Sequence, residues 1–89
     1  MQAEFNYGLL FEAGKKYSCE IVSHKNNSCQ IHAEGVPVQL LGLARNFVFP
    51  SRPVFSELVG WQGECEVELN LRKNGLFATK IVLKMNEMK

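Results

Sequence analysis

The sequence predicts an all-β protein: a Greek-key barrel of five to six strands with one short helix. Three observations support this: apolar and polar residues alternate over 16–41 and 62–85, turn-forming residues divide these segments, and a long connection, 42–60, contains two prolines. Alternation is typical of strands with one buried face, because successive side chains point to opposite sides of a sheet. A chain of 89 residues has room for one domain, 1–89.

The first segment, residues 1–14, predicts an additional N-terminal strand. Phe5, Tyr7 and Phe11 alternate with other residues, and a turn at Ala13-Gly14 would end the strand. We interpret its aromatic row as closing the barrel. A dimer contact through an exposed strand edge is the alternative.

The second segment, 16–41, predicts a meander of three short strands. A three-residue loop at 25–27 would pair Ile21 with Ile31, and a two-residue turn at 34–35 would pair Ile31 with Val38. Both registers place the apolar side chains on the same face. Turn chemistry and hydrophobic pattern therefore agree.

The connection 42–60 predicts a short helix rather than a strand. Pro50 and Pro53 exclude a central strand, because proline cannot donate a ladder hydrogen bond. The helix is expected over 53–59, with Ser51 or Arg52 as its N-cap and Gly60 at its end.

The last segment, 62–85, predicts a hairpin. A three-residue loop at 73–75, with Gly75 left-handed and a bulge, would pair Val67 with Ile81. The same register would pair Glu68 with Lys80 and Glu64 with Lys84. These charge pairs would help to set the register.

In its element order, from Lys16 to Lys84, the chain resembles small OB-fold proteins, whose five-stranded Greek-key barrel has a helix between strands three and four. The segment NGLFATKIVL (74–83) is also similar to the last hairpin of cold-shock-type domains. The second strand, SCQIHA, has His32 as its one aromatic ring, so the cold-shock binding residues do not carry over. An SH3-like barrel or a small β-sandwich is the structural alternative.

The candidate catalytic groups have simpler structural interpretations. Glu64, Glu66 and Glu68 share one strand face, but Lys80 and Lys84 opposite them indicate a solvated face. Three further residues that could hold a metal ion, Glu20, His24 and His32, do not have a zinc-site spacing. The three cysteines fall on inward faces as free thiols. With neither a nucleophile motif nor a glycine-rich phosphate loop, the sequence predicts a non-enzymatic protein without cofactor or metal.

The OB-fold resemblance implies a ligand face on strands two and three, between two loops. Cations and amides in both loops are suited to phosphate and base contacts, although the net charge of +1 argues against bulk attraction to nucleic acid. We therefore expect single-stranded DNA or RNA as the partner. The residues expected to contact it are Lys25, Asn26, Asn27, Gln30, His32, Gln39, Arg72, Lys73 and Asn74, with Arg45, Phe47, Phe49 and Arg52 from the long connection.

The alternative function is protein–protein interaction or inhibition. Arginine and aromatic residues are enriched at protein interfaces, and the 45–61 segment contains both. The N-terminal strand edge could bind a protein partner, a larger assembly or a second copy of the chain. The chain has no apolar run of membrane-spanning length and no basic leader, so we expect a cytoplasmic protein that does not bind membranes.

Overall fold

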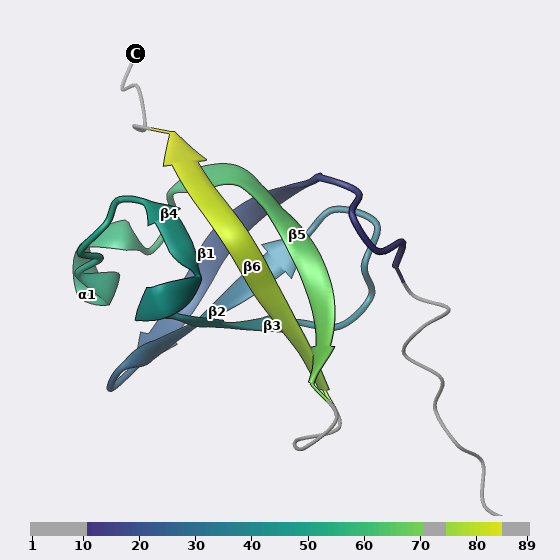
Figure 1. Cartoon of the computed structure of the whole chain (residues 1–89). Coiled ribbons are helices and arrows are strands. Elements are labelled where there is room, and N and C mark those ends of the chain that lie inside the picture. The colour runs from purple at the N-terminus through teal and green to yellow at the C-terminus, as the bar shows by residue number, and fades with distance from the viewer. Residues whose placement is uncertain (1–10, 71–74, 85–89) are drawn as a thin grey trace, which may run out of the picture.

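The computed structural model describes residues 11–70 and 75–84. Its strands are β1 (Tyr17–Lys25), β2 (Ser28–Ala33), β3 (Leu40–Leu43), β4 (Phe47–Phe49), β5 (Gln62–Asn70) and β6 (Gly75–Lys84) (Figure 1). A 3-10 helix, η2 (Ala44–Asn46), precedes β4, and a four-residue helix, α1 (Phe55–Leu58), precedes β5. The predicted all-β class is confirmed.

The strands form one closed ring. The sheet order is β3-β2-β1-β5-β6-β4, and an additional parallel pairing of β3 with β6 joins Leu41 to Phe77. The other ring pairings, β1–β2, β2–β3, β1–β5 and β5–β6, are antiparallel. The chain is therefore a small all-β barrel, with β4 added beside β6 at the edge of the sheet.

One apolar core fills the ring. Its buried side chains come from all six strands and α1, and the largest fully buried ones are Ile21, Ile31, Leu40, Ile81 and Leu83. The three cysteines are buried and free, as predicted. Phe47 and Phe55 pack together with ring centroids 5.7 Å apart, so β4 and α1 cover one end of the barrel.

The β1–β2 hairpin confirms the expected pairing of Ile21 with Ile31 but not the expected turn. Lys25 pairs with Ser28, so the connection is the two-residue turn 26–27 rather than a three-residue loop. Asn26 adopts a φ of 53°, a left-handed conformation that asparagine accepts more readily than most residues. The shorter turn shifts the pairing of Ser23, His24 and Lys25 by one residue. Val22 is an extra residue in β1, and this bulge compensates for the shift, so Ile21 still pairs with Ile31.

The predicted β2–β3 register is wrong. Ile31 pairs with Leu40 rather than Val38. The predicted turn at 34–35 is present, since Val36 N–H donates to the Ala33 carbonyl at 3.0 Å, but residues 36–39 then connect the strands without pairing with β2. The predicted faces are nevertheless found: Val36 and Leu40 are buried and Val38 packs against the core. Hydrophobic side chains in this connection face inward without being part of a ladder.

The long connection contains less helix than predicted. α1 spans four residues, its N-cap is Val54 rather than Ser51 or Arg52, and no side chain caps it. Residues 47–49 form an unexpected strand, which pairs with β6 in parallel at the edge of the sheet. The prolines that exclude a central strand do not prevent an edge strand that ends just before them.

The predicted register of the β5–β6 hairpin is also wrong. Val67 pairs with Ala78 rather than Ile81, and Glu68 pairs with Phe77 rather than Lys80. Lys80 forms its ion pair with Glu66 instead, at 3.5 Å, and Lys84 lies opposite Gln62. The expected turn lies in 71–74, outside the described residues.

A bulge at Lys80 explains this difference. Lys80 has a φ of 50° and adds an extra residue to β6, so the strand changes its inward face there. Leu76 and Ala78 face inward before the bulge, and Ile81 and Leu83 face inward after it. A left-handed residue costs about 1–2 kcal/mol, whereas burying one leucine or isoleucine contributes about 1.5–3 kcal/mol. The bulge is therefore favourable.

The expected N-terminal strand falls mostly on residues 1–10, outside the described residues. Phe11 packs against the core, and the Ala13-Gly14 turn is present. Among the described residues, no helix is long and apolar enough to cross a membrane.

Gly63 provides a test of this packing. A Cβ atom there would lie 2.7 Å from the Leu83 Cα atom and would also clash with the backbone of Val82. Because backbone cannot rotate away, we expect Gly63→Ala to reduce the free energy of unfolding by about 3 kcal/mol in urea titrations. Gly42→Ala is the matched control: it meets the ends of two side chains, Ile31 Cδ1 and Cys29 Sγ, and should cost less. An equal or smaller loss for Gly63→Ala would contradict this packing.

Candidate functional site

The outer surface of β1, β2, β3 and β6 carries a continuous row of side chains. Ser23 pairs with Gln30, Gln30 with Leu41, and Leu41 with Phe77. Residues that are directly opposite on neighbouring strands project to the same side of a sheet. The four side chains therefore form one row around the barrel, which we call the β1–β6 row.

Phe77 provides the aromatic ring of this row. Alternation with Thr79 and Ile81 predicts an inward position for Phe77, but the bulge at Lys80 turns this side chain outward. It is half-buried, while its neighbours Leu76 and Ala78 are almost fully buried. The row therefore contains a ring beside the apolar side chain of Leu41, which is also half-buried.

The hydrogen-bonding groups of the row come from β1 and β2. Ser23 Oγ donates to Gln30 Oε1 at 2.7 Å, so this contact holds the Gln30 amide against β1. The amide nitrogen of Gln30 has two further hydrogens to donate. His32 projects from the next outward position of β2, opposite Glu20, and is exposed.

Positive charge lies at the end of the row near the β1–β2 turn. Lys25 pairs with Ser28, and Ser28 pairs with Leu43, two residues before Arg45. Lys25 and Arg45 are both exposed. Ser28 Oγ donates to the Lys25 carbonyl at 3.1 Å and so stabilises the turn that presents the lysine.

The structure brings together only part of the predicted contact set. Asn26 and Asn27 are exposed in the turn that follows Lys25, and Gln39 is exposed just before β3, whereas Arg72, Lys73 and Asn74 lie outside the described residues. The expected contact by Phe47 is wrong, because its side chain is 7% exposed and belongs to the core. Phe49 is exposed and pairs with Val82 of β6, which is not part of the row, and Arg52 is exposed in the connection that follows β4.

Sequence reasoning missed Phe77, the aromatic ring of the row. It follows a turn and alternates with Thr79 and Ile81, and that pattern alone places it with the core. Nothing in the amino-acid sequence indicates that Lys80 adopts a left-handed conformation. The outward position of Phe77 beside Leu41 follows from the pairing of β3 with β6, which joins residues far apart in the sequence.

The predicted Glu20, His24 and His32 set does not assemble. Glu20 and His32 are paired, but the bulge at Val22 shifts His24, which pairs with Cys29 instead. Among residues 11–70 and 75–84, no group of three or more histidine, cysteine or acidic side chains could hold a metal ion.

Two of the three thiols, those of Cys29 and Cys65, hold their protons more tightly than a free cysteine, whereas a hydrogen bond with Cys65 lowers the pKa of the Cys19 thiol. Burial raises the pKa of the Cys29 thiol from 9.0 to about 12, with a smaller contribution from the charge of Cys19. A hydrogen bond with Cys19 and burial raise the pKa of Cys65 as well. A thiol with a raised pKa holds its proton and is a poor nucleophile.

No protein-family model matches the chain, and no curated protein does so either.

Deprotonation of Cys29 should destabilise the fold. The folded state holds this proton more tightly than the unfolded chain, so stability is complete below pH 9 and falls as the pH rises toward 12. The maximum slope from this thiol is about 1.4 kcal/mol per pH unit. We expect Cys29→Ala to reduce the fall in unfolding free energy between pH 8 and pH 10.5 in urea titrations. An unchanged slope would show that Cys29 ionises equally in both states.

Proposed function

We propose that this protein is a non-enzymatic module that binds single-stranded nucleic acid across the β1–β6 row. The observation that carries the proposal is the outward position of Phe77 beside Leu41, in register with Gln30. Single-strand binders combine rings on which bases stack with cations that contact the backbone. The row places both beside hydrogen-bonding side chains.

The proposed division of roles follows the chemistry of each group. Phe77 and Leu41 form the platform on which a base stacks. The Gln30 amide and the His32 imidazole donate to and accept from base edges. Lys25 and Arg45 contact phosphates near the end of the row, which suits a ligand that carries one charge per nucleotide.

Glu68 limits the proposed site on the side of Phe77 that faces β5. It pairs with Phe77 and is exposed, so a carboxylate follows the ring around the barrel. A phosphate backbone would be repelled there. The proposed path of the strand therefore runs from Phe77 toward β2 and Lys25 rather than toward β5.

Protein recognition is the second candidate function, and a separate surface favours it. Phe49 and Val48 of β4 are 54% and 61% exposed, and Val82, the partner of Phe49 in β6, is 38% exposed. Exposed apolar side chains that adjoin one another are typical of protein interfaces. This β4 patch could bind a protein partner, a larger assembly or a second copy of the chain.

A cytoplasmic location is part of the proposal. The three cysteines remain free and buried, which agrees with a reducing compartment.

Phe77→Ala tests the main proposal. Stacking of one base contributes about 1–3 kcal/mol, so we expect the affinity for a labelled single-stranded oligonucleotide to fall about 5- to 150-fold. Fluorescence anisotropy with oligo-dT and oligo-U at low salt measures this directly. Phe49→Ala is the matched control, because it removes an exposed ring from the β4 patch and should leave oligonucleotide binding unchanged. No binding by the wild-type protein, or equal losses in both variants, would refute the proposal.

Lys25→Gln tests the phosphate contact. The salt dependence of binding should become shallower by about 0.7 in the log–log slope, because one fewer counterion is released from a single strand. Anisotropy titrations at several salt concentrations give the slope. Lys84→Gln, at the far end of β6, should leave the slope as it is. A slope unchanged by Lys25→Gln would remove this residue from the interface.

A further inference from the structure

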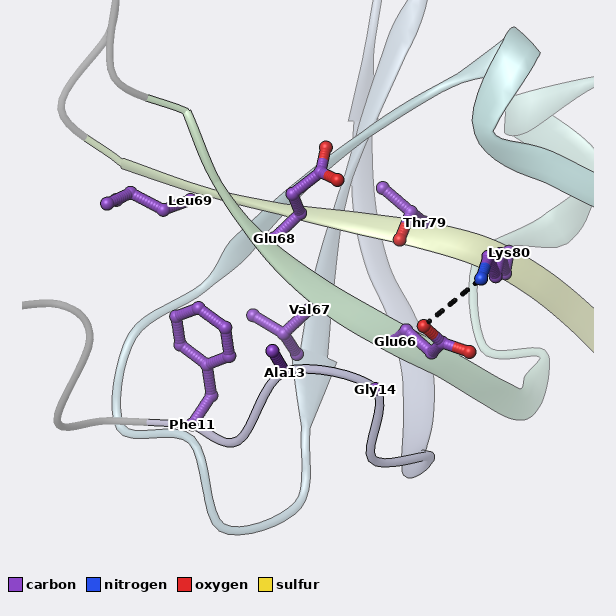
Figure 2. Close-up of a pocket in the computed structure, with 9 residues that line it drawn as sticks. All are labelled: Phe11, Ala13, Gly14, Glu66, Val67, Glu68, Leu69, Thr79 and Lys80. Atoms are coloured by element: carbon purple, nitrogen blue, oxygen red, sulfur yellow. Dashed lines mark ion pairs between the residues drawn. The ribbon is translucent and has the colours of Figure 1, made fainter.

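A groove of about 370 Å³ lies between β5 and the segment that precedes β1 (Figure 2). Phe11, Ala13 and Gly14 line one side, and residues 66–69 of β5, together with Thr79 and Lys80 of β6, line the other. β1 pairs with β5 only as far as Tyr17 and Cys65. From Glu66 onward, the edge of β5 that faces the groove has no partner strand among the described residues.

The backbone of β5 presents hydrogen-bonding groups to this groove. Ile21 N–H donates to the Trp61 carbonyl at 2.9 Å, so the backbone groups of Trp61 point toward β1. These directions alternate along a strand. Cys65, Val67 and Leu69 therefore direct their N–H and C=O groups to the same side. For Val67 and Leu69 this side is the groove.

The segment across the groove does not use these groups. Its hydrogen bonds among the described residues are internal or go to Tyr17: Lys15 N–H donates to the Glu12 carbonyl, and Glu12 N–H donates to the Tyr17 hydroxyl at 2.7 Å. The backbone groups of Val67 and Leu69 thus resemble those of an edge strand that is available for pairing.

The side chains around the groove differ in chemistry. Phe11, Val67 and Leu69 form the apolar floor of the groove, and all three pack on the core. Glu66 and Glu68 project from the outer face of β5 (Figure 2). Lys80 pairs with Glu66, whereas Glu68 is exposed and forms no ion pair with a described residue. The outer rim of the groove therefore carries two carboxylates and one ammonium group, and Glu68 is the carboxylate that forms no ion pair with a described residue.

We propose that this groove binds an extended peptide segment of a partner protein, in which basic and apolar residues alternate, by strand addition to β5. The added strand runs antiparallel to β5, and its main chain bonds to Val67 and Leu69. Its apolar side chains face Phe11 and the core, while its basic side chains lie beside Glu68. The unpaired Glu68 carboxylate disfavours a phosphate backbone here, so the groove is distinct from the β1–β6 row.

The test uses a fluorescein-labelled peptide of alternating lysine and valine, titrated with the full chain. In antiparallel strand addition, the valines opposite Val67 and Leu69 direct their N–H groups to β5. We expect N-methylation of the valines to weaken binding tenfold or more, since it removes these hydrogen bonds. N-methylation of the lysines should change the affinity by less than threefold. No binding, or equal losses for the two methylated peptides, would overturn strand addition.

Glu68→Lys tests the charge complementarity, with Glu64→Lys as its matched control. Both glutamates are exposed on the outer face of β5, but only Glu68 lines the groove. Peptide affinity should fall at least tenfold for Glu68→Lys and less than threefold for Glu64→Lys, with both variants folded by circular dichroism. Equal losses would indicate general attraction of charges and would overturn the site.

Two further measurements separate this proposal from its alternatives. Sedimentation should show a monomer in the presence and absence of peptide; a dimer that the peptide fails to dissociate would assign the edge to a second copy and overturn the proposal. Oligonucleotide binding by Glu68→Lys should be undiminished, because the variant removes a carboxylate beside Phe77. Loss of peptide binding and loss of oligonucleotide binding are thus independent results.

Discussion

The ring closes at the contact between β3 and β6, and the rest of the barrel depends on this closure. Leu41 and Phe77 form the parallel pair that joins the two ends of the antiparallel sheet. A closed ring demands that every strand keep one face inward along its whole length. Straight alternation cannot satisfy this in β1 and β6, and the bulges at Val22 and Lys80 adjust the register of both strands.

The same bulges arrange the outer surface. The shift at Lys80 turns Phe77 outward, and the shift at Val22 moves His24 away from His32. The first change creates an aromatic position on the β1–β6 row, and the second removes a possible metal site. Surface chemistry in this protein is therefore a consequence of how the core is filled.

Glu68 separates two surfaces of opposite character. On one side lie Phe77 and the uncharged and basic residues of β1 and β2, which suit a polyanion. On the other lies the groove, where β5 has no partner strand among the described residues and the Glu68 carboxylate is available to a basic strand. A barrel with both could hold a nucleic acid and a protein segment together, since neither ligand would need to displace the other.

The sequence by itself determined the all-β class, the central pairing of Ile21 with Ile31, the burial of three free cysteines and the outward row of glutamates on β5. These features depend on local alternation, which reports whether a side chain is buried. Only the tertiary structure decided the register of the last hairpin, the pairing of β3 with β6, the edge strand β4 and the position of Phe77. A bulge changes the inward face by one residue without leaving a pattern in composition. Its position is set by closure of the ring, to which residues far apart in the chain contribute together.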